Sequence, residues 1–244
     1  MNETYFSRTE LLVGQQGMQK LAQTSVAVIG LGGVGSYSAE ALARSGIGKL
    51  ILIDFDVIEP TNINRQILAL QSNIGKPKVE LMQQRILDIN PKAEVIIYQE
   101  VLDENKQDSL LAGAEYCVDA IDSLSAKISL LEFLLKNERK FISVMGAGNR
   151  LDPSQIHIST IDKSYNCPLA RKVRKLLSKK GIKGSFPCVY SSELPLKIAE
   201  DNEVTEAEDL LQVKQRKVIG SISYLPSIMG LMAASYVIRD ILKD

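Results

Sequence analysis

The feature that most constrains the fold is a glycine-rich turn between a short apolar run and a helical pattern. Ser25–Ile29 is apolar and leads directly into the run Gly30–Gly35. Residues 34–45 then have helical character and stop at a glycine, after which Lys49–Ile53 is apolar again. The order strand, glycine turn, helix, strand is that of a βαβ unit, in which the two strands lie parallel.

The alternation of strand and helix patterns continues along the chain. Apolar residues at helical spacing predict further helices, and short apolar runs predict further strands. Repeated alternation with buried strands is typical of an α/β protein, so we predict a Rossmann-like, doubly wound, mostly parallel sheet. The predicted helices are short pieces within 10–23 and single helices at 79–89 and 125–136, and the predicted strands are 95–98, 116–121 and 141–145.

The pattern changes after residue 150. Residues 155–161 predict one more strand, and a helix is expected from about residue 226 to residue 242. The length of 244 residues suits one domain, residues 1–244. Within it we assign 8–148 to a nucleotide-binding core and 149–244 to a C-terminal α/β extension that binds the substrate.

The glycine turn predicts a phosphate site. Its glycines permit a tight turn and let the backbone approach a phosphate at the positive end of the following helix. Asp54 ends the next strand, where a carboxylate can accept hydrogen bonds from ribose hydroxyls. This pattern suits NAD as well as ATP, and a glycine turn without a ligand is the plain alternative. The glycines are Gly30, Gly32, Gly33 and Gly35.

Charged and polar residues beyond the second strand favour a triphosphate. A dinucleotide's pyrophosphate is largely satisfied by backbone N–H groups, so extra cations beside the turn indicate a more highly charged ligand. Arg65 offers phosphate a planar fork and Lys78 a point charge, with surface cations as the alternative. The dense polar string around Arg65 fits neither an amphipathic helix nor a strand. The other polar candidates are Asp56, Asn62 and Gln66.

Asp122 is a candidate magnesium ligand. It follows the strand predicted at 116–121, and open α/β sheets bind ligands at this end of their strands. A carboxylate there can hold Mg²⁺ against phosphates. The alternative is that Asp122 caps the helix that follows, and the two roles can coexist.

The motifs of residues 8–148 together resemble one family. In order they read G-x-G-G-V-G-S, D-F-D, T-N-x-N-R-Q, G-K-P-K and D-A-I-D. They are similar to those of the bacterial enzymes related to ubiquitin-activating proteins, which include the adenylyltransferases for molybdopterin and thiamine sulfur carriers. The resemblance implies that ATP and Mg²⁺ bind here. It assigns their binding to Asp54, Asn62, Arg65, Gln66, Lys78 and Asp122.

The same resemblance implies a homodimer. In that family an arginine on the N-terminal helices reaches into the partner subunit's site, and Arg8 occupies that place here. Without the resemblance, Arg8 would be interpreted as a surface arginine near the chain terminus. The residues expected to act on the reacting groups are Arg8, Arg65, Lys78 and Asp122.

The C-terminal half resembles a branch of the family that acts on tRNA. Its motifs are G-A-G-N-R-L-D-P at 146–153, P-L-A at 168–170, C-V-Y-S-S-E at 188–193 and G-S-I-S at 220–223. This resemblance implies an ATP-dependent dehydratase whose substrate is tRNA carrying threonylcarbamoyladenosine. The threonyl carboxylate becomes an acyl-adenylate with loss of pyrophosphate, and the carbamoyl group then closes onto it with release of AMP.

A second hypothesis is an adenylyltransferase that activates the C-terminus of a ubiquitin-like sulfur-carrier protein. It requires a carrier or sulfur-transfer protein as partner. Such activators usually carry paired C-x-x-C zinc motifs, whereas Cys117, Cys167 and Cys188 lie far apart. We interpret Cys188 as a packing residue, with thioester formation as the alternative. A dinucleotide-binding module or pseudo-enzyme is the third hypothesis.

A basic segment favours tRNA as the partner. The net charge is zero, so binding of a nucleic acid requires a local patch. Residues 163–183 carry eight Lys or Arg and no Asp or Glu, and we expect them to contact tRNA phosphates. A solvated charged face is the alternative. Residues 193–209 carry seven acids and one lysine, which predicts a solvated loop.

We expect the protein to be cytoplasmic. Separated free cysteines suit a reducing compartment, and the first ten residues lack the apolar core of a signal peptide. Val218–Ile238 carries no charge and is long enough to span a bilayer, but it contains two glycines, a proline and four serines. We therefore expect a buried helix and no integral span, with peripheral contact at a membrane as the alternative.

Overall fold

Seven strands form one sheet in the order β3-β2-β1-β4-β5-β7-β6. The structure is a computed structural model, and it describes residues 5–182, 184–197 and 219–243. All neighbouring strands are parallel except β6, which pairs antiparallel with β7 at one edge. The predicted Rossmann-like α/β fold is confirmed. The strands are β1 (Ser25–Ile29), β2 (Lys49–Ile53), β3 (Glu94–Tyr98), β4 (Tyr116–Asp119), β5 (Lys140–Val144), β6 (Ile156–Thr160) and β7 (Pro187–Ser191).

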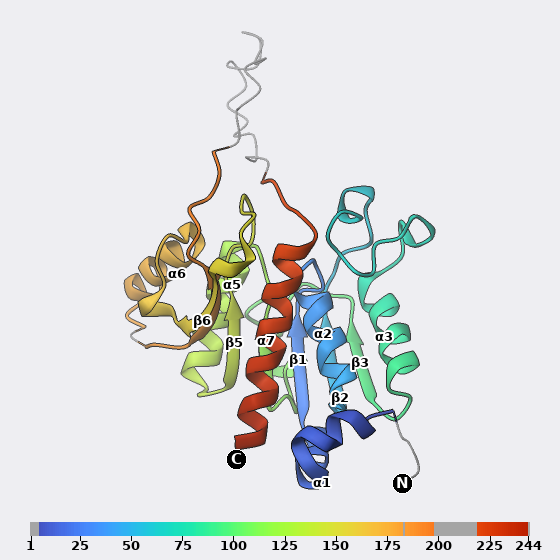
Figure 1. The fold of residues 1–244 in the computed structure, drawn as a ribbon. Helices are drawn as coiled ribbons and strands as arrows, with labels where there is room; N and C mark the ends of the chain where they lie inside the picture. Colours follow the sequence, from blue (N-terminus) through green and yellow to red (C-terminus); the bar gives the residue numbers. More distant parts are fainter. Residues whose placement is uncertain (1–4, 183, 198–218, 244) are drawn as a thin grey trace.

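Helices cover both faces of the sheet and divide the apolar interior into two cores. One core packs Leu42, Met82 and Val237 of α2, α3 and α7 against the face that is nearer in Figure 1. The other packs Leu131 and Val173 of α5 and α6 against the opposite face. Strands buried on both faces need apolar residues throughout, which explains the unbroken apolar run of β1. The helices are α1 (Ser7–Gln23), α2 (Gly35–Arg44), α3 (Lys78–Ile89), α4 (Gln107–Leu110), α5 (Leu124–Lys136), α6 (Pro168–Lys179) and α7 (Tyr224–Lys243).

α1 lies at the end of the sheet where the parallel strands begin (Figure 1). Gly14, at φ +71°, breaks it into two short helical pieces, as the sequence predicts. Gly48, just before β2, donates its N–H to the carbonyl of Leu21 over 3.1 Å. A Cβ added to Gly48 would lie 1.8 Å from the carbonyl oxygen of Ala22. This close backbone contact holds α1 against the start of β2.

α7 is long and apolar enough to cross a membrane by length and composition, but half of its apolar window is buried inside the protein. Leu225 and Met229 are fully buried. A Cβ added to Gly230 would lie 2.2 Å from the carbonyl oxygen of Val34, so α7 and α2 touch through their backbones. The expected buried helix is confirmed. Its apolar side packs on α2, so this helix gives no support to contact with a membrane.

β4 and β7 differ from the predictions, and the short helix α4 was not predicted. β4 ends at Asp119 and not at residue 121, because the Asp119 Oδ1 accepts a hydrogen bond from the backbone N–H of Ile121 (3.1 Å) and the chain turns there. The sequence did not indicate β7. This five-residue strand is stabilised by pairing with β5 on one side and with β6 on the other. Of the acidic segment 193–209, residues 198–209 lie outside the described residues.

Candidate nucleotide-binding site

The glycine turn joins β1 to α2 at the end of the sheet where the parallel strands finish. Gly30 has φ +88°, and a Cβ added there would lie 2.9 Å from the carbonyl oxygen of Ala120. The same atom on Gly35 would lie 1.7 Å from the carbonyl oxygen of Gly30, so the packing requires both glycines. A Cβ on Gly32 would meet only Gln66 Nε2, at 3.9 Å. Gly32 therefore leaves free space over the turn, as a bound phosphate requires.

Asp54 braces this turn from the end of β2. Its Oδ2 accepts the backbone N–H of Leu31 over 2.5 Å, and its Oδ1 accepts that of Asp56 over 2.8 Å. Asp54 is buried, and this burial raises the pKa of its carboxyl group, although the charge of Lys78 and the two backbone hydrogen bonds act in the opposite direction. The sequence predicted that Asp54 binds ribose hydroxyls. The structure shows in addition that Asp54 holds the glycine turn in shape.

Lys78 is a buried cation and not a surface one. It is the first residue of α3, and its side chain is 5% exposed. Its Nζ lies 2.7 Å from Asp56 Oδ2, and Asp56 is 46% exposed. A buried ammonium group requires a partner of opposite charge, and the partner here is the carboxylate of Asp56, which is exposed to solvent. The alternative of a surface cation is therefore wrong for Lys78.

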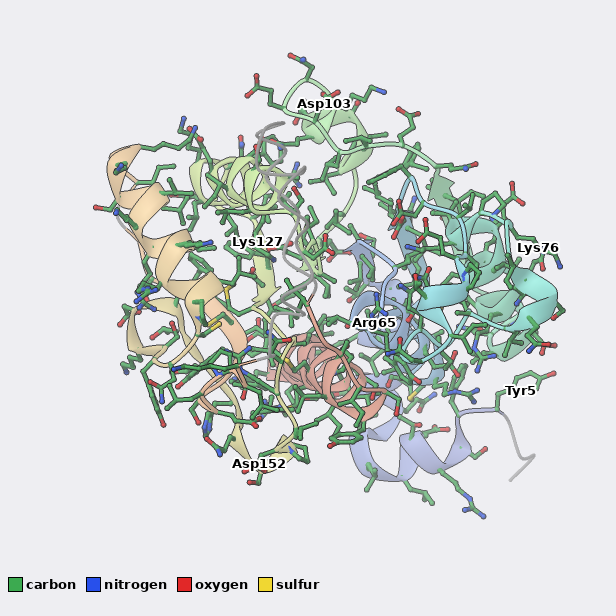
Figure 2. All side chains as sticks on the ribbon, turned by 90° about the horizontal axis from the view of Figure 1, so that it is seen from above. Tyr5, Arg65, Lys76, Asp103, Lys127 and Asp152 are labelled. Atoms are coloured by element: carbon green, nitrogen blue, oxygen red, sulfur yellow. The ribbon has the colours of Figure 1, made fainter. Side chains whose placement is uncertain are left out.

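Arg65 is half-buried on the loop after the 3₁₀ turn η1 (Pro60–Asn62). Its Nη1 donates to the carbonyl of Thr61 (2.9 Å) and to Asn64 Oδ1 (2.8 Å). A Cβ added to Gly33 would lie 3.2 Å from Arg65 Cγ, so the arginine stem lies against the glycine turn. Figure 2, which looks down on this end of the sheet, places Arg65 near the middle of the view. The structure thus brings Arg65 and the glycine turn together.

Asn62 and Gln66 are both buried in the same loop. The backbone N–H of Glu59 donates to Asn62 Oδ1 over 3.1 Å, so Asn62 closes the turn. Gln66 Oε1 is buried and has no hydrogen-bond partner among the described residues. A buried acceptor without a donor is costly. A hydrogen-bond donor on a bound ligand would satisfy it.

Asp122 lies three residues past the end of β4 and is exposed. The N-cap of α5 is Ser123, so the helix-cap alternative for Asp122 is wrong. Its turn lies close to the glycine turn, since a Cβ added to Gly30 would lie 3.4 Å from the backbone nitrogen of Ile121. No cluster of three or more His, Cys, Asp or Glu forms a metal site in the described residues. A single carboxylate nevertheless fits Mg²⁺ that also binds substrate phosphates.

A buried ion pair beside the turn that leads to Asp122 was not predicted. Lys127 and Asp119 are both fully buried, and Lys127 Nζ lies 2.6 Å from Asp119 Oδ2. Lys127 also donates to Ser143 Oγ (3.3 Å) and to the carbonyl of Val144 (3.1 Å), which ties α5 to β4 and β5. Removal of one partner of such a buried pair strongly destabilises a protein, because the other charge is left buried without compensation. The available signal in the sequence was a lysine inside the apolar pattern of the helix predicted at 125–136.

Arg8 and the cysteines lie apart from this site. Arg8 is exposed on α1, and α1 lies at the end of the sheet opposite the glycine turn of its own chain (Figure 1). Cys188 is fully buried, and burial raises the pKa of its thiol to about 12. Burial likewise raises the pKa of Cys117 to about 12. Thiols held in this protonated state do not act as nucleophiles, which supports the packing role expected for Cys188.

The basic segment divides into free and packed cations. Arg174 Nη1 donates to the carbonyls of Ile161 (2.9 Å) and Ser164 (3.0 Å), so this arginine holds α6 to the preceding loop. Lys180 pairs with Glu132 over 2.6 Å. In Figure 2, α6 lies on the opposite side of the view from Lys76. The exposed cations of α6 are Arg171, Lys172, Lys175 and Lys179.

The sequence profile of the ThiF family matches residues 6–244, nearly the whole chain. This chain belongs to the ThiF family. The family resemblance inferred from the glycine turn and the motifs that follow it is thereby confirmed.

Within the ThiF family, the similarity to tRNA-modifying enzymes extends over both halves. The chain is 42% identical over 241 residues to tRNA threonylcarbamoyladenosine dehydratase of Bacillus subtilis, a match that covers 98% of this chain and 95% of that protein. It is also similar to solved structures of E. coli tRNA N6-threonylcarbamoyladenosine dehydratase in complex with AMP and with ATP. Each has 33% identity and a TM-score of 0.87, and covers 98% of this chain and 94% of that one.

The similarity to a sulfur-carrier activator is shorter. Molybdopterin-synthase adenylyltransferase of Salmonella typhimurium is 35% identical over 115 residues, which is 47% of this chain and 46% of that protein. This match covers less than half of the chain, whereas the similarity to the dehydratases covers nearly all of it. The carrier-protein hypothesis is therefore not favoured.

Proposed function

We propose that this protein is an ATP-dependent dehydratase that cyclises threonylcarbamoyladenosine in tRNA. The observation that carries the proposal is the similarity to dehydratases along the whole chain, at 42% identity over 98% of its length. The candidate nucleotide site supports the proposal. The free space over Gly32 lies near half-buried Arg65 and near Gln66, whose buried Oε1 has no hydrogen-bond partner among the described residues. A related structure in complex with ATP has the same fold.

In the proposed reaction, the glycine turn and the start of α2 bind the phosphates of ATP through backbone N–H groups. Arg65 and Lys78 balance negative charge on these phosphates. The threonyl carboxylate attacks the α-phosphate, and pyrophosphate leaves. The neighbouring carbamoyl group then attacks the activated carbonyl, and AMP leaves. The second attack is intramolecular, so its entropy cost is largely met in advance and no protein nucleophile is needed.

Mg²⁺ is proposed as the metal, with Asp122 as its ligand. Its exposed carboxylate beside the glycine turn fits a hard cation that takes its other ligands from phosphates and water. When bound, the ion would neutralise charge on those phosphates. Asp119 and Lys127 would hold the turn that carries Asp122, through the hydrogen bond from Ile121 to Asp119.

The proposed partners are tRNA and a second copy of this chain. The exposed cations of α6 suit tRNA phosphates. Arg8 is exposed and stands away from the site of its own chain, which suits a role in a partner subunit's site. We place the reaction in the cytoplasm.

One assay separates the proposed function from the carrier-protein alternative. ATP–pyrophosphate exchange is measured with tRNA carrying threonylcarbamoyladenosine, with the same tRNA lacking the modification, and with a ubiquitin-like carrier ending in Gly-Gly. Exchange only with modified tRNA supports the proposal, and exchange only with the carrier contradicts it. Calorimetric titration supplies a second check, since NAD binding tighter than MgATP would contradict a triphosphate site.

A further inference from the structure

Asn64 forms hydrogen bonds with both ends of its side-chain amide. Its Oδ1 accepts Arg65 Nη1 over 2.8 Å, and its Nδ2 donates to the carbonyl of Ser221 over 3.0 Å. Ser221 is 157 residues away in the sequence and belongs to the segment that leads into α7. One side chain therefore connects the loop that carries Arg65 to the C-terminal half.

The C-terminal end of this connection is itself held in place by Asn149. The backbone N–H of Gly220 donates to Asn149 Oδ1 (2.6 Å), and the Asn149 N–H donates to the carbonyl of Gly220 (2.8 Å). The carbonyl of Asn149 also accepts the N–H of Leu196 over 2.7 Å. Asn149 has φ +59°, a left-handed conformation that asparagine tolerates better than most residues. Three segments of the C-terminal half thus meet at this residue.

The loop around Asn149 is anchored by its neighbour, Arg150, which is 4% exposed. Arg150 Nη1 donates to the carbonyl of Gly146 (2.7 Å), and its Nε donates to the carbonyl of Glu193 (3.1 Å). The carboxylate of Glu193 accepts the N–H groups of Leu151 and Asp152, at 3.0 Å and 2.9 Å to its Oε2. This network gives Asn149 a defined position after β5.

We propose that Asn64 is a positioning residue that sets the Arg65 guanidinium against the C-terminal half. Nη1 of Arg65 is occupied by Thr61 and Asn64, whereas no acceptor in the described part of the chain takes its Nε or Nη2. Those two donors are left for phosphate oxygens. The inference rests on the proposed function, because Arg65 contacts ATP there. It adds that Asn149, on the other half of the chain, acts on nucleotide binding through Gly220, Ser221 and Asn64.

The test measures MgATP affinity by calorimetry without tRNA. Asn64→Ala is expected to weaken binding about fivefold, since it removes one hydrogen bond to a charged group. Asn73→Ala is the matched control. Asn73 lies at the end of the 3₁₀ turn η2 (Gln71–Asn73), also between β2 and α3. Its amide nitrogen donates to the carbonyl of Leu68 (3.0 Å), its amide oxygen accepts from Lys76 Nζ (3.3 Å), and it has no hydrogen bond to Arg65. Its effect on affinity is expected to be negligible.

Asn149→Gly tests the distant end of the link. Glycine accepts the left-handed conformation and keeps the backbone hydrogen bonds, but it lacks the Oδ1 that holds Gly220. A loss of about twofold to threefold in affinity is expected, with an unchanged unfolding temperature. Addition of Asn64→Ala to this variant should bring the loss only to that of Asn64→Ala alone, because both changes act through one link.

An Arg65→Ala background separates the possible failures. If Asn64 acts through Arg65, Asn64→Ala should cause no further loss in that background. A full fivefold loss there, or equal losses in Asn64→Ala and Asn73→Ala, would overturn the positioning role. If Arg65→Ala itself leaves MgATP affinity unchanged, then the assignment of Arg65 in the proposed function fails as well.

Discussion

The two halves of the chain place their cations in different surroundings. In the nucleotide half, Lys78 is buried and its ammonium group faces the carboxylate of Asp56. In the C-terminal half, the cations of α6 divide into Arg174, which packs on backbone carbonyls, and exposed side chains such as Arg171 and Lys175. A buried cation acts as an individual group at short range, whereas exposed cations act collectively and are screened by salt. The halves should therefore respond differently to substitution.

The largest expected effect is that of Lys78→Met, which removes the buried charge but keeps most of the side-chain volume. Hydrogen bonds to charged groups contribute about 1.5–3 kcal/mol, so MgATP affinity should fall by about ten- to a hundredfold. Lys76→Met is the control. Lys76 is exposed and lies two residues before Lys78, so the Lys76→Met variant should bind ATP with normal affinity. Calorimetry measures both variants. Equal losses of MgATP affinity in the two variants would contradict the expected difference between a buried and an exposed cation.

Arg8 tests whether the nucleotide site is complete within one chain. At an ATP concentration well below that needed to saturate the variants, Arg8→Ala and Lys78→Met should each lose most of their activity, and mixed subunits should recover up to about a quarter of wild-type activity by random pairing in a C₂ dimer. The recovered site combines Arg8 of one chain with Lys78 of the other. The absence of recovery after verified subunit exchange argues against a shared site.

Charge reversal on α6 should have a smaller effect and a different signature. Arg171→Glu with Lys175→Glu should raise the apparent KM for tRNA and reduce the salt slope by about one per lost phosphate contact, with little change in the KM for ATP. Lys92→Glu, on an exposed loop before β3, is the control. Arg174→Glu should instead lower the unfolding temperature, because it leaves the carbonyls of Ile161 and Ser164 without their donor. Equal losses for tRNA and ATP would indicate a damaged fold.

The smallest effect is expected for Cys188→Ala. The variant should retain substantial activity and lose about 1 kcal/mol of stability, as is common for a change in a packed core. At pH 8 a thiol with a pKa of about 12 is ionised in about one molecule in 10,000, so iodoacetamide should modify Cys188 only after unfolding. Complete loss of activity with a normal fold would return a thioester mechanism to consideration.

Local patterns in the sequence determined most of the nucleotide half. The glycine turn, β1 and β2 were predicted at their observed positions, because each depends on a continuous stretch of residues. Apolar periodicity and turn residues report local backbone geometry, and the geometry of a βαβ unit is largely local. The motifs also brought Lys78 and Arg65 into the candidate site before any distance was known.

Only the tertiary structure revealed contacts between segments far apart in the chain. Asn64 reaches Ser221 across 157 residues, and the Asp119–Lys127 pair gains its third partner, Ser143, from a neighbouring strand. It likewise showed that Arg174 is packed while other cations of the same helix are free. A single sequence specifies which groups can form hydrogen bonds and ion pairs. Which of them meet depends on how the sheet and helices pack, because partners distant in the chain leave no periodic signal.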